Sequence, residues 1–308
     1  MPKQGVLEVD GKQVKVTNLE KVLYPAASFT KADVIDYYIA ISPVLLPHLK
    51  NRPISLKRYP DGVEGFFFYE KRCPPGRPDW VDTARVSSRR KEGFIDYCVM
   101  NELSALVWAA NLADLELHTF LHRAPKLECP DFVVFDLDPG PPADLINCCE
   151  VALLLQKVFD GLDLRSFPKT SGSKGLQLYV PLNGRTRYDS TKAFARAVAQ
   201  NLERAHPDLV VSKMQKSLRK GKVFVDWSQN DDHKTTVCVY SLRAKEHPTV
   251  STPVSWEEVT AAKKKGDPGL LTFETGDVLQ RVKERGDLFA SVLAVKQRLP
   301  KRAVAGDG

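Results

Sequence analysis

The segment from Phe132 to Gly140 constrains the fold of this chain most strongly, because it has the pattern of a buried strand that ends in two carboxylates. Four apolar residues, 132–135, precede Asp136, Leu137 and Asp138. Successive side chains of a strand point to opposite faces, so Asp136 and Asp138 are expected on one face and Leu137 on the other. Two neighbouring carboxylates repel each other unless a cation lies between them, and their oxygens suit Mg²⁺ or Mn²⁺. The pattern predicts a metal site, although such a pair also arises by chance in a chain with 38 acidic residues.

A second segment, Val223 to Trp227, is also typical of a buried strand, and it carries Asp226. An unpaired carboxylate is costly to bury. If the two strands are neighbours, the three acids form one site that could hold two divalent ions for phosphoryl transfer. Alternatively, Asp226 forms an ion pair with one of the 45 Lys and Arg residues. The spacing alone does not distinguish these interpretations.

Between the two strands, Thr170 to Gly175 combines two glycines with serines and Lys174. The backbone N–H groups of such a loop, together with the ammonium group, can cradle a phosphate. The spacing is not that of a Walker loop. A plain turn between two strands explains the segment equally well.

The remaining pattern alternates helices with strands. Thr30 to Asp33 resembles a capping box at the start of a helix, and residues 145–159 and 191–202 predict two further amphipathic helices. Residues 263–269 predict a basic loop before a last helix, and residues 87–93 predict the tip of a basic hairpin.

Charge and cysteine usage indicate the cellular setting. The formal net charge of +7 favours a polyanionic partner. The six cysteines show no C-x-x-C pair, so reduced thiols are expected in place of disulfides. No apolar run approaches the roughly 20 residues of a membrane span, and a soluble, cytoplasmic protein is expected. His118 and His122 have the spacing of a helical zinc pair, but no further ligands accompany them, and no zinc site is expected.

Taken together, these motifs and their order resemble the polymerase domain of bacterial ligase D, in the archaeo-eukaryotic primase superfamily. The resemblance rests on VFDLDPG at 134–140, TSGSKGL-x-LY-x-P at 170–181, KSLR-x-GKVFVDWSQN at 216–230, YSLR-x-x-x-HPTV at 240–250 and NLEKVLYP at 18–25. It covers nearly the whole chain.

The resemblance implies an α/β (α+β) fold. In this fold a mainly antiparallel, RRM-like sheet carries the acids and is flanked by helices, and an N-terminal α/β module precedes it. Residues 1–300 would form a single primase-polymerase domain of two packed lobes, with a DNA-contacting part at about 1–125 and a catalytic core at about 126–300. Residues 301–308 would be a tail or linker.

The resemblance also assigns roles to individual residues. Asp136, Asp138 and Asp226 would be the catalytic residues and would bind the metals. The residues implied to line the nucleotide pocket are His118, Ser171, Lys174, Gln177, Lys216, Arg219, Gln229 and Arg243. One departure concerns Gln177, which stands where the family usually has a histidine; an amide can donate to a phosphate oxygen but carries no charge.

The DNA-contacting residues lie in the N-terminal third. By resemblance, Lys21 and Lys31 hold a 5′-phosphate, and Phe68 and Tyr69 stack on template bases. The segments that contain them, together with Lys57 and Arg58, interleave cations with aromatic rings, which suits nucleic-acid contact. Alternatively the aromatic rings are core, and this is expected for at least two of the four at 66–69.

The function implied is that of a metal-dependent DNA/RNA nucleotidyltransferase, a primase-polymerase that fills gaps and extends DNA ends in non-homologous end joining. Two divalent ions, Mn²⁺ or Mg²⁺, and a nucleoside triphosphate, with ribonucleotides preferred, would take part. The implied partner is DNA with gaps, nicks or double-strand breaks that carry a 5′-phosphate; Ku and a DNA ligase are candidate protein partners.

Two alternatives belong to other classes. A haloacid-dehalogenase-type phosphatase also carries a D-x-D motif after a hydrophobic strand, but Pro139 and Gly140 stand where its motif has Gly and then Thr or Val. A DNA-end-bridging module without turnover would not need the complete set of three acids.

Overall fold

The computed structural model describes residues 4–88 and 93–300. The chain divides into two compact units, which are described in turn. Unit 1 comprises residues 1–125, 235–251 and 273–287, and unit 2 comprises residues 126–234, 252–272 and 288–308. Two segments from the C-terminal part of the chain therefore belong to the same unit as its N-terminal third.

Unit 1 is built on a six-stranded sheet in which every pairing is antiparallel. Its strand order is β15 (Thr235–Val237), β9 (Asp114–Phe120), β5 (Pro53–Arg58), β8 (Phe94–Val99) and β7 (Asp82–Ser87), and β6 (Phe68–Glu70) also pairs with β5. Two small hairpins precede the sheet, formed by β1 (Gln4–Val9) with β2 (Lys12–Thr17) and by β3 (Val22–Tyr24) with β4 (Phe29–Thr30). The helices of this unit are α1 (Lys31–Leu49), α2 (Leu103–Asn111) and α6 (Thr275–Arg285).

Helix α1 begins as its sequence predicts. The Thr30 side chain accepts from the Asp33 backbone, and the Asp33 side chain accepts from the Thr30 backbone, which completes a capping box. The helix packs against α2 and α6 within unit 1. Its capping residues therefore fix the start of the helix around which the unit is assembled.

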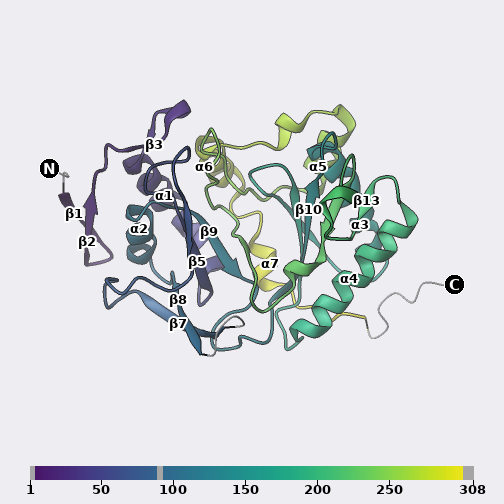
Figure 1. The fold of residues 1–308 in the computed structure, drawn as a ribbon, viewed down its shortest axis with the longest axis horizontal. Helices are drawn as coiled ribbons and strands as arrows, with labels where there is room; N and C mark the ends of the chain where they lie inside the picture. Colours follow the sequence, from purple (N-terminus) through teal and green to yellow (C-terminus); the bar gives the residue numbers. More distant parts are fainter. Residues whose placement is uncertain (1–3, 89–92, 301–308) are drawn as a thin grey trace. The chain divides into compact units, whose positions relative to one another are not determined.

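Unit 2 is built on a five-stranded sheet (Figure 1). The order is β11 (Phe167–Thr170), β12 (Leu176–Pro181), β10 (Phe132–Pro139), β14 (Val223–Asp226) and β13 (Val210–Val211). All pairings are antiparallel except that of β13 with β14. The helices of this unit are α3 (Leu145–Asp160), α4 (Tyr188–Ala205), α5 (Trp256–Lys265) and α7 (Ala290–Ala294).

The alternation of side chains on β10 divides the two faces of this sheet. Phe135 contacts Phe159 of α3 and Phe194 of α4, so these helices cover the face that also carries Val133 and Leu137. Asp136 and Asp138 point to the opposite face. The face with the acids is also apolar at its start, where Val134 and Phe132 are buried, and becomes polar only at Asp136 and Asp138.

Short 3₁₀ segments complete the described secondary structure, at Pro25–Ala27, Lys216–Leu218, Trp227–Gln229 and Pro268–Leu271. Over residues 4–88 and 93–300, no helix is both long and apolar enough to cross a membrane.

The two further predicted helices are confirmed as α3 and α4, the latter longer than expected at both ends. The predicted loop at 263–269 is wrong in its first half. Lys263 to Lys265 form the last turn of α5, where cations are favoured by the helix dipole. Gly266 ends the helix with a φ of 65°, and only the residues after it form the turn.

The hairpin predicted around residues 87–93 joins β7 to β8, with Ser87 opposite Phe94. Its tip, residues 89–92, lies outside the described residues.

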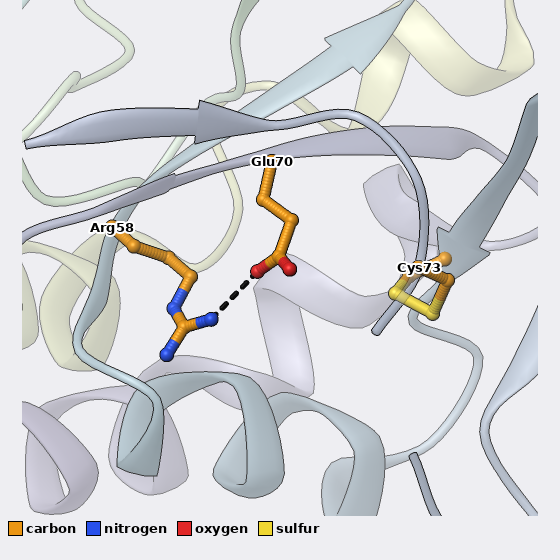
Figure 2. The surroundings of a disulfide bond; sticks show 4 residues. Arg58, Glu70 and Cys73 are labelled. Atoms are coloured by element: carbon orange, nitrogen blue, oxygen red, sulfur yellow. Dashed lines mark hydrogen bonds and ion pairs between the residues drawn. A yellow bond between two sulfur atoms is a disulfide. The ribbon is translucent and has the colours of Figure 1, made fainter. Parts of the chain in front are cut away.

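The prediction that all cysteines are thiols is wrong, because Cys73 and Cys98 form a disulfide (Figure 2). The spacing of the cysteines does not predict this pair, because the two residues are 25 positions apart and become neighbours only when the segment after β6 runs beside β8. The Cys73 backbone N–H donates to the Asp96 carbonyl at 2.7 Å, which aligns the segment with that strand. The ion pair from Arg58 to Glu70, 2.7 Å long, holds the preceding strand β6 to β5 (Figure 2).

Replacing both bridged cysteines, as Cys73→Ser/Cys98→Ser, is expected to lower the free energy of unfolding by about 3.5 kcal/mol, because a loop of this length regains its freedom in the unfolded chain. Urea unfolding without reductant measures the loss. Cys129→Ser, at a free and only half-buried thiol, is the matched control and should change little. Equal stability of the double variant and wild type would contradict the bridge.

Asp114, on β9, is a fully buried carboxyl group. Its Oδ1 accepts the Lys57 backbone N–H at 2.7 Å, whereas Oδ2 has no hydrogen-bond partner among the described residues. Burial raises the pKa of Asp114 well above its ordinary value, although the hydrogen bond from Lys57 and the charge of Arg58 act against this.

Because the pKa of Asp114 is higher in the folded than in the unfolded state, the wild type should lose stability as the pH rises from about 4 towards the folded-state value. Asp114→Asn cannot ionise and keeps the acceptor for Lys57. We expect the variant to be more stable than wild type by on the order of 1 kcal/mol at pH 7, with a smaller difference at pH 4. Denaturant unfolding at the two pH values measures this, and a difference that shrinks with rising pH would contradict it.

Candidate active site

The three predicted acids come together on one face of the unit 2 sheet. Asp136 on β10 lies directly opposite Asp226 on β14, and Asp138 lies two residues further along β10. Directly opposed residues of antiparallel strands point to the same face. Asp136 and Asp226 are half-buried and Asp138 is exposed, so the cluster lies where the apolar part of the strands ends.

Asp136 is the acid whose ionisation is perturbed. Burial, together with the negative charges of Asp138 and Asp226, raises the pKa of Asp136 to about 7. A hydrogen bond from Gln177 and the positive charge of Lys169 act in the opposite direction. A cation bound beside Asp136 would favour its ionised form.

Asp226 already has protein partners. Its Oδ1 accepts the Ser228 backbone N–H at 2.9 Å and the Ser228 hydroxyl, and its Oδ2 accepts from Gln229 at 3.4 Å. These bonds cap the 3₁₀ turn that follows β14. Within residues 4–88 and 93–300, no group of three His, Cys, Asp or Glu side chains has the geometry of a formed metal site.

Gln177 lies next to the acids. It is opposite Asp136 in the β10–β12 ladder and is buried, with only 3% of its surface exposed. Its hydrogen bond goes to the Asp136 carboxylate. In this structure Gln177 supports an acid.

The loop between β11 and β12 is tightly closed. Ser171 N–H donates to the Gly175 carbonyl at 2.9 Å, and the Ser171 hydroxyl accepts the N–H groups of Ser173 and Gly175 at 3.2 and 3.1 Å. Gly175 lies so close to β10 that a Cβ there would stand 1.9 Å from the Leu137 carbonyl oxygen. The Lys174 side chain is exposed at the tip of this loop. The loop is therefore both a strand-to-strand turn and a support that presents Lys174.

Arg219 is held over the acid face by stacking. Its guanidinium carbon lies 3.7 Å from the centre of the Phe224 ring, and its Nη2 donates to the Met214 carbonyl at 2.8 Å. Phe224 is opposite Asp138, so the arginine is placed on the side of the acids. Its buried Nε has no partner in the described part of the chain. Lys216, in the same segment, is exposed.

Gly140 allows this arrangement. A Cβ at that position would lie 1.9 Å from the Arg219 carbonyl oxygen. The backbone of Gly140 also donates to the Lys222 carbonyl at 2.8 Å and accepts from Gly221 at 2.9 Å. The segment that carries Lys216 and Arg219 is thus clamped to the end of β10.

In unit 1, His118 and Arg243 gather around a residue that the sequence did not single out, Glu116. Glu116 Oε2 lies 2.9 Å from His118 Nε2, 3.2 Å from Lys57 Nζ and 3.4 Å from Arg243 Nε. Burial acts to raise the pKa of Glu116, but the His118 hydrogen bond and the charges of Arg243, His118 and Lys57 hold it well below its ordinary value. Burial lowers the pKa of His118 despite its bond to Glu116. One buried carboxylate therefore fixes three basic side chains.

Aromatic rings surround Lys57 on its other sides. Its ammonium group lies 4.9 to 5.5 Å from the ring centres of Tyr59, Phe67 and Tyr69. Tyr69 also meets His118 edge to face at 5.5 Å. Lys57 is thus held by an ion pair and by three rings.

The expectation that at least two of the rings at 66–69 are core is wrong. Phe66, Phe67 and Tyr69 are 71%, 47% and 51% exposed, and Phe68 is half-buried beside Phe66. The segment leads into the short strand β6, which pairs with β5, and Phe67 and Tyr69 each contact a ring of unit 1, Tyr59 and His118, while staying exposed. Arg58, predicted with them, bonds Glu70 at 2.7 Å and stacks on Phe68.

Lys21 and Lys31 are placed close enough to influence each other, but both have protein partners. Lys21 Nζ lies 2.9 Å from Asp61, and Lys31 Nζ donates to the Asn111 carbonyl at 3.0 Å. Burial lowers the pKa of Lys31, and the charges of Lys21 and Arg58 add to this effect. The three cations therefore lie near one another.

The first backbone N–H groups of α1 already have acceptors within the protein. The N–H groups of Lys31 and Ala32 donate to the carbonyls of Lys21 and Leu19, and that of Asp33 donates to the Thr30 hydroxyl. The chain before the helix folds back over its first turn and satisfies it, which the capping signal alone did not indicate.

Two buried charged residues beside the predicted site residues were not predicted from the sequence. Lys169 is 0% exposed and lies opposite Gln177, and Glu116 is 1% exposed on β9. For Lys169 the available signal was a charge inside a short strand, Phe167 to Thr170; Glu116 lies between Asp114 and His118, and its strand gave no such signal.

Comparison with known proteins decides the family. Residues 30–289 match the family model described as LigD, primase-polymerase domain. The chain belongs to this family. As a primase-polymerase domain it is a DNA-directed nucleotidyltransferase, and the α/β fold expected from the sequence is confirmed.

Relatives of the LigD domain in several bacteria match most of this chain. It is 43% identical over 286 residues to the multifunctional non-homologous end joining protein LigD of Mycolicibacterium smegmatis. The aligned region covers 91% of this chain and 36% of that protein. It is 32% identical over 293 residues to the bifunctional protein LigD of Bacillus subtilis, covering 95% of this chain and 46% of that protein. The LigD domain here thus spans less than half the length of these relatives.

A solved structure matches over its whole length. The polymerase domain from Mycobacterium tuberculosis ligase D in complex with DNA has a TM-score of 0.85 and 40% identity, covering 92% of this chain and 99% of that chain.

Gly140→Ala is expected to displace the Arg219 segment, because the new Cβ cannot coexist with the Arg219 carbonyl. Amide hydrogen exchange should accelerate at 216–222, and nucleotide affinity should fall by roughly tenfold or more as Arg219 loses its place. Gly276→Ala is the matched control, since a Cβ there meets nothing within 4 Å. Unchanged exchange at 216–222 would show that the clamp is not needed.

Proposed function

We propose that this chain extends a DNA primer by template-directed nucleotidyl transfer, filling gaps and extending broken ends in non-homologous end joining. The observation that carries the proposal is the register of β10 and β14, which sets Asp136 opposite Asp226 with Asp138 beside them, in a chain of the LigD primase-polymerase family.

The three acids fit a pair of divalent cations, Mn²⁺ or Mg²⁺. Three carboxylates share one face, and burial together with their repulsion raises the pKa of Asp136, an effect that a cation would oppose. Asp226 would exchange its Ser228 and Gln229 partners for a metal. Two such ions, held by Asp136, Asp138 and Asp226, would supply activation of the primer 3′-hydroxyl and neutralisation of the triphosphate.

The protein's own groups would bind and orient the triphosphate. Arg219, stacked on Phe224 with its buried Nε unsatisfied, is preorganised to donate to a phosphate oxygen. Lys174 and Lys216 are exposed. Lys174 belongs to the loop after β11, and Lys216 belongs to the segment that carries Arg219; both of these stretches approach β10. Ser171, Gln177 and Gln229 are proposed to line the same nucleotide pocket, where Ser171 also closes the loop and the two glutamines bond Asp136 and Asp226.

Glu116 gives His118 and Arg243 a defined orientation, which suits their proposed contact with the nucleotide. We assign template stacking to the exposed segment around Phe68 and Tyr69, and phosphate contact to Lys57 and Arg58, because rings and cations alternate there at the surface. Preference for ribonucleotides, and association with Ku and a DNA ligase, belong to the same proposal by virtue of the family.

Asp226→Ala is expected to reduce nucleotide addition by at least a thousandfold, because one shared metal ligand is lost. Binding of the variant to gapped DNA should stay within about twofold of wild type. Extension of a labelled gapped duplex with nucleotides and Mn²⁺ measures the first, and fluorescence anisotropy measures the second. Asp208→Ala, at an exposed acid of the same unit, is the control.

The same assay tests the alternatives. Release of phosphate without primer extension would indicate a phosphatase, and binding without turnover would indicate a bridging module. A wild-type protein that only binds DNA would overturn the proposed activity.

Lys21 and Lys31, with Arg58 beside them, are proposed to receive the 5′-phosphate at the far side of a gap. The phosphate would take over Lys21 from Asp61. Lys21→Ala/Lys31→Ala should lose roughly 5- to 50-fold in affinity for a 5′-phosphorylated gap and little for the unphosphorylated gap. Anisotropy with both duplexes measures the preference, and Lys15→Ala/Lys50→Ala, at two exposed lysines of unit 1, is the control. A double variant that keeps the full preference would place the phosphate elsewhere.

A further inference from the structure

Lys169 belongs to a row of polar residues that crosses the unit 2 sheet. It lies opposite Gln177, which is opposite Asp136, which in turn is opposite Asp226. Directly opposed residues in antiparallel strands share a face, so the four side chains follow one another across β11, β12, β10 and β14. Lys169 is the only cation of this row.

The row ends in a buried site. Lys169 has none of its surface exposed. β11 is the last strand of the sheet, but residues 252–253 cover its outer edge: Thr170 N–H donates to the Thr252 carbonyl at 2.8 Å, and Lys169 forms an isolated bridge with Pro253. The ammonium group lies 5.6 Å from the centre of the Tyr179 ring.

A lysine is rarely buried this completely, because its charge is strongly hydrated. If only the hydrocarbon part of the Lys169 side chain mattered, an apolar residue would fill this position at a lower cost. The acids in the same row can compensate electrostatically for burying this positive charge. Lys169 and Asp136 are the two residues opposite Gln177 in its neighbouring strands, so the positive charge lies on the face that carries the acids.

We propose that Lys169 is a positioning residue of the acid site, a fixed buried cation that offsets part of the charge of the three carboxylates and so sets the balance between divalent cations and triphosphate. This inference rests on the proposed function. Lys169 itself touches neither metal nor nucleotide; its charge acts across Gln177, over about two strand spacings of roughly 4.8 Å each.

A fixed cation repels a metal ion and attracts a triphosphate, so its removal should move the two affinities in opposite directions. Lys169→Met is expected to tighten Mn²⁺ binding in the absence of nucleotide by roughly three- to tenfold and to weaken triphosphate binding by a similar factor. A merely structural role would weaken both, because a distorted site holds neither. Lys169→Arg, which keeps the charge, should restore both affinities towards wild type.

The experiment titrates Mn²⁺ alone by electron paramagnetic resonance, and a fluorescent nucleoside triphosphate in separate samples, for wild type and variants at pH 8.5. Lys263→Met is the matched control: it removes one charge from α5, where Lys263 pairs with Glu150 at 3.2 Å, and should change neither affinity. Thermal unfolding confirms that each variant is folded, and Lys169→Gln replaces Lys169→Met if the latter is not.

Opposite shifts in the two affinities support the assignment. Parallel losses, or no change in either, overturn it. Neither titration measures primer extension, so failure of the proposed activity would appear separately, as a wild-type protein that binds Mn²⁺ and nucleotide without extending a primer.

Discussion

The unit 2 sheet depends on one constraint, the antiparallel register that sets Asp136 opposite Asp226. Two carboxylates in this position repel each other. The unfavourable energy is offset by the apolar contacts on the other face of β10, where Phe135 packs against Phe159 and Phe194. A shift of the register by one residue would turn Asp136 and Asp138 into that core and expose Leu137. The apolar packing therefore holds the acids close together, where hydrogen bonds from Gln177 and Ser228, a proton or a cation can offset their repulsion.

The segments around the acids follow from the same register. Gly140 and Gly175 have no room for a Cβ, because the Arg219 segment and the loop after β11 press directly onto the backbone of β10. Close backbone approach replaces side-chain packing at these two points. As a result, Arg219 and the tip of the loop take their positions from the strand that carries the acids.

Unit 1 contains a comparable cluster of charges, with the signs reversed. There a single buried carboxylate, Glu116, holds Lys57, His118 and Arg243, whereas in unit 2 several carboxylates are accompanied by the buried Lys169. In unit 1 the buried counter-charge pairs directly with the groups that would otherwise repel one another, whereas Lys169 is separated from the acids by Gln177. Neither counter-charge belongs to a motif that can be recognised by its spacing, and both were missed.

The sequence by itself determined the strands that carry the acids, the capped start of α1, helices α3 and α4, and the family, because alternation, caps and contiguous motifs are local properties of the chain. It did not reveal that Cys73 meets Cys98, that Gln177 bonds Asp136, that Phe66, Phe67 and Tyr69 stay exposed, or that the N–H groups in the first turn of α1 already have acceptors. Each of these depends on which distant segment lies alongside, and only the tertiary structure decides that. A polar group makes its bonds with whatever neighbour the packing of apolar faces brings within about 3 Å, and the spacing of residues along the chain does not record who that neighbour is.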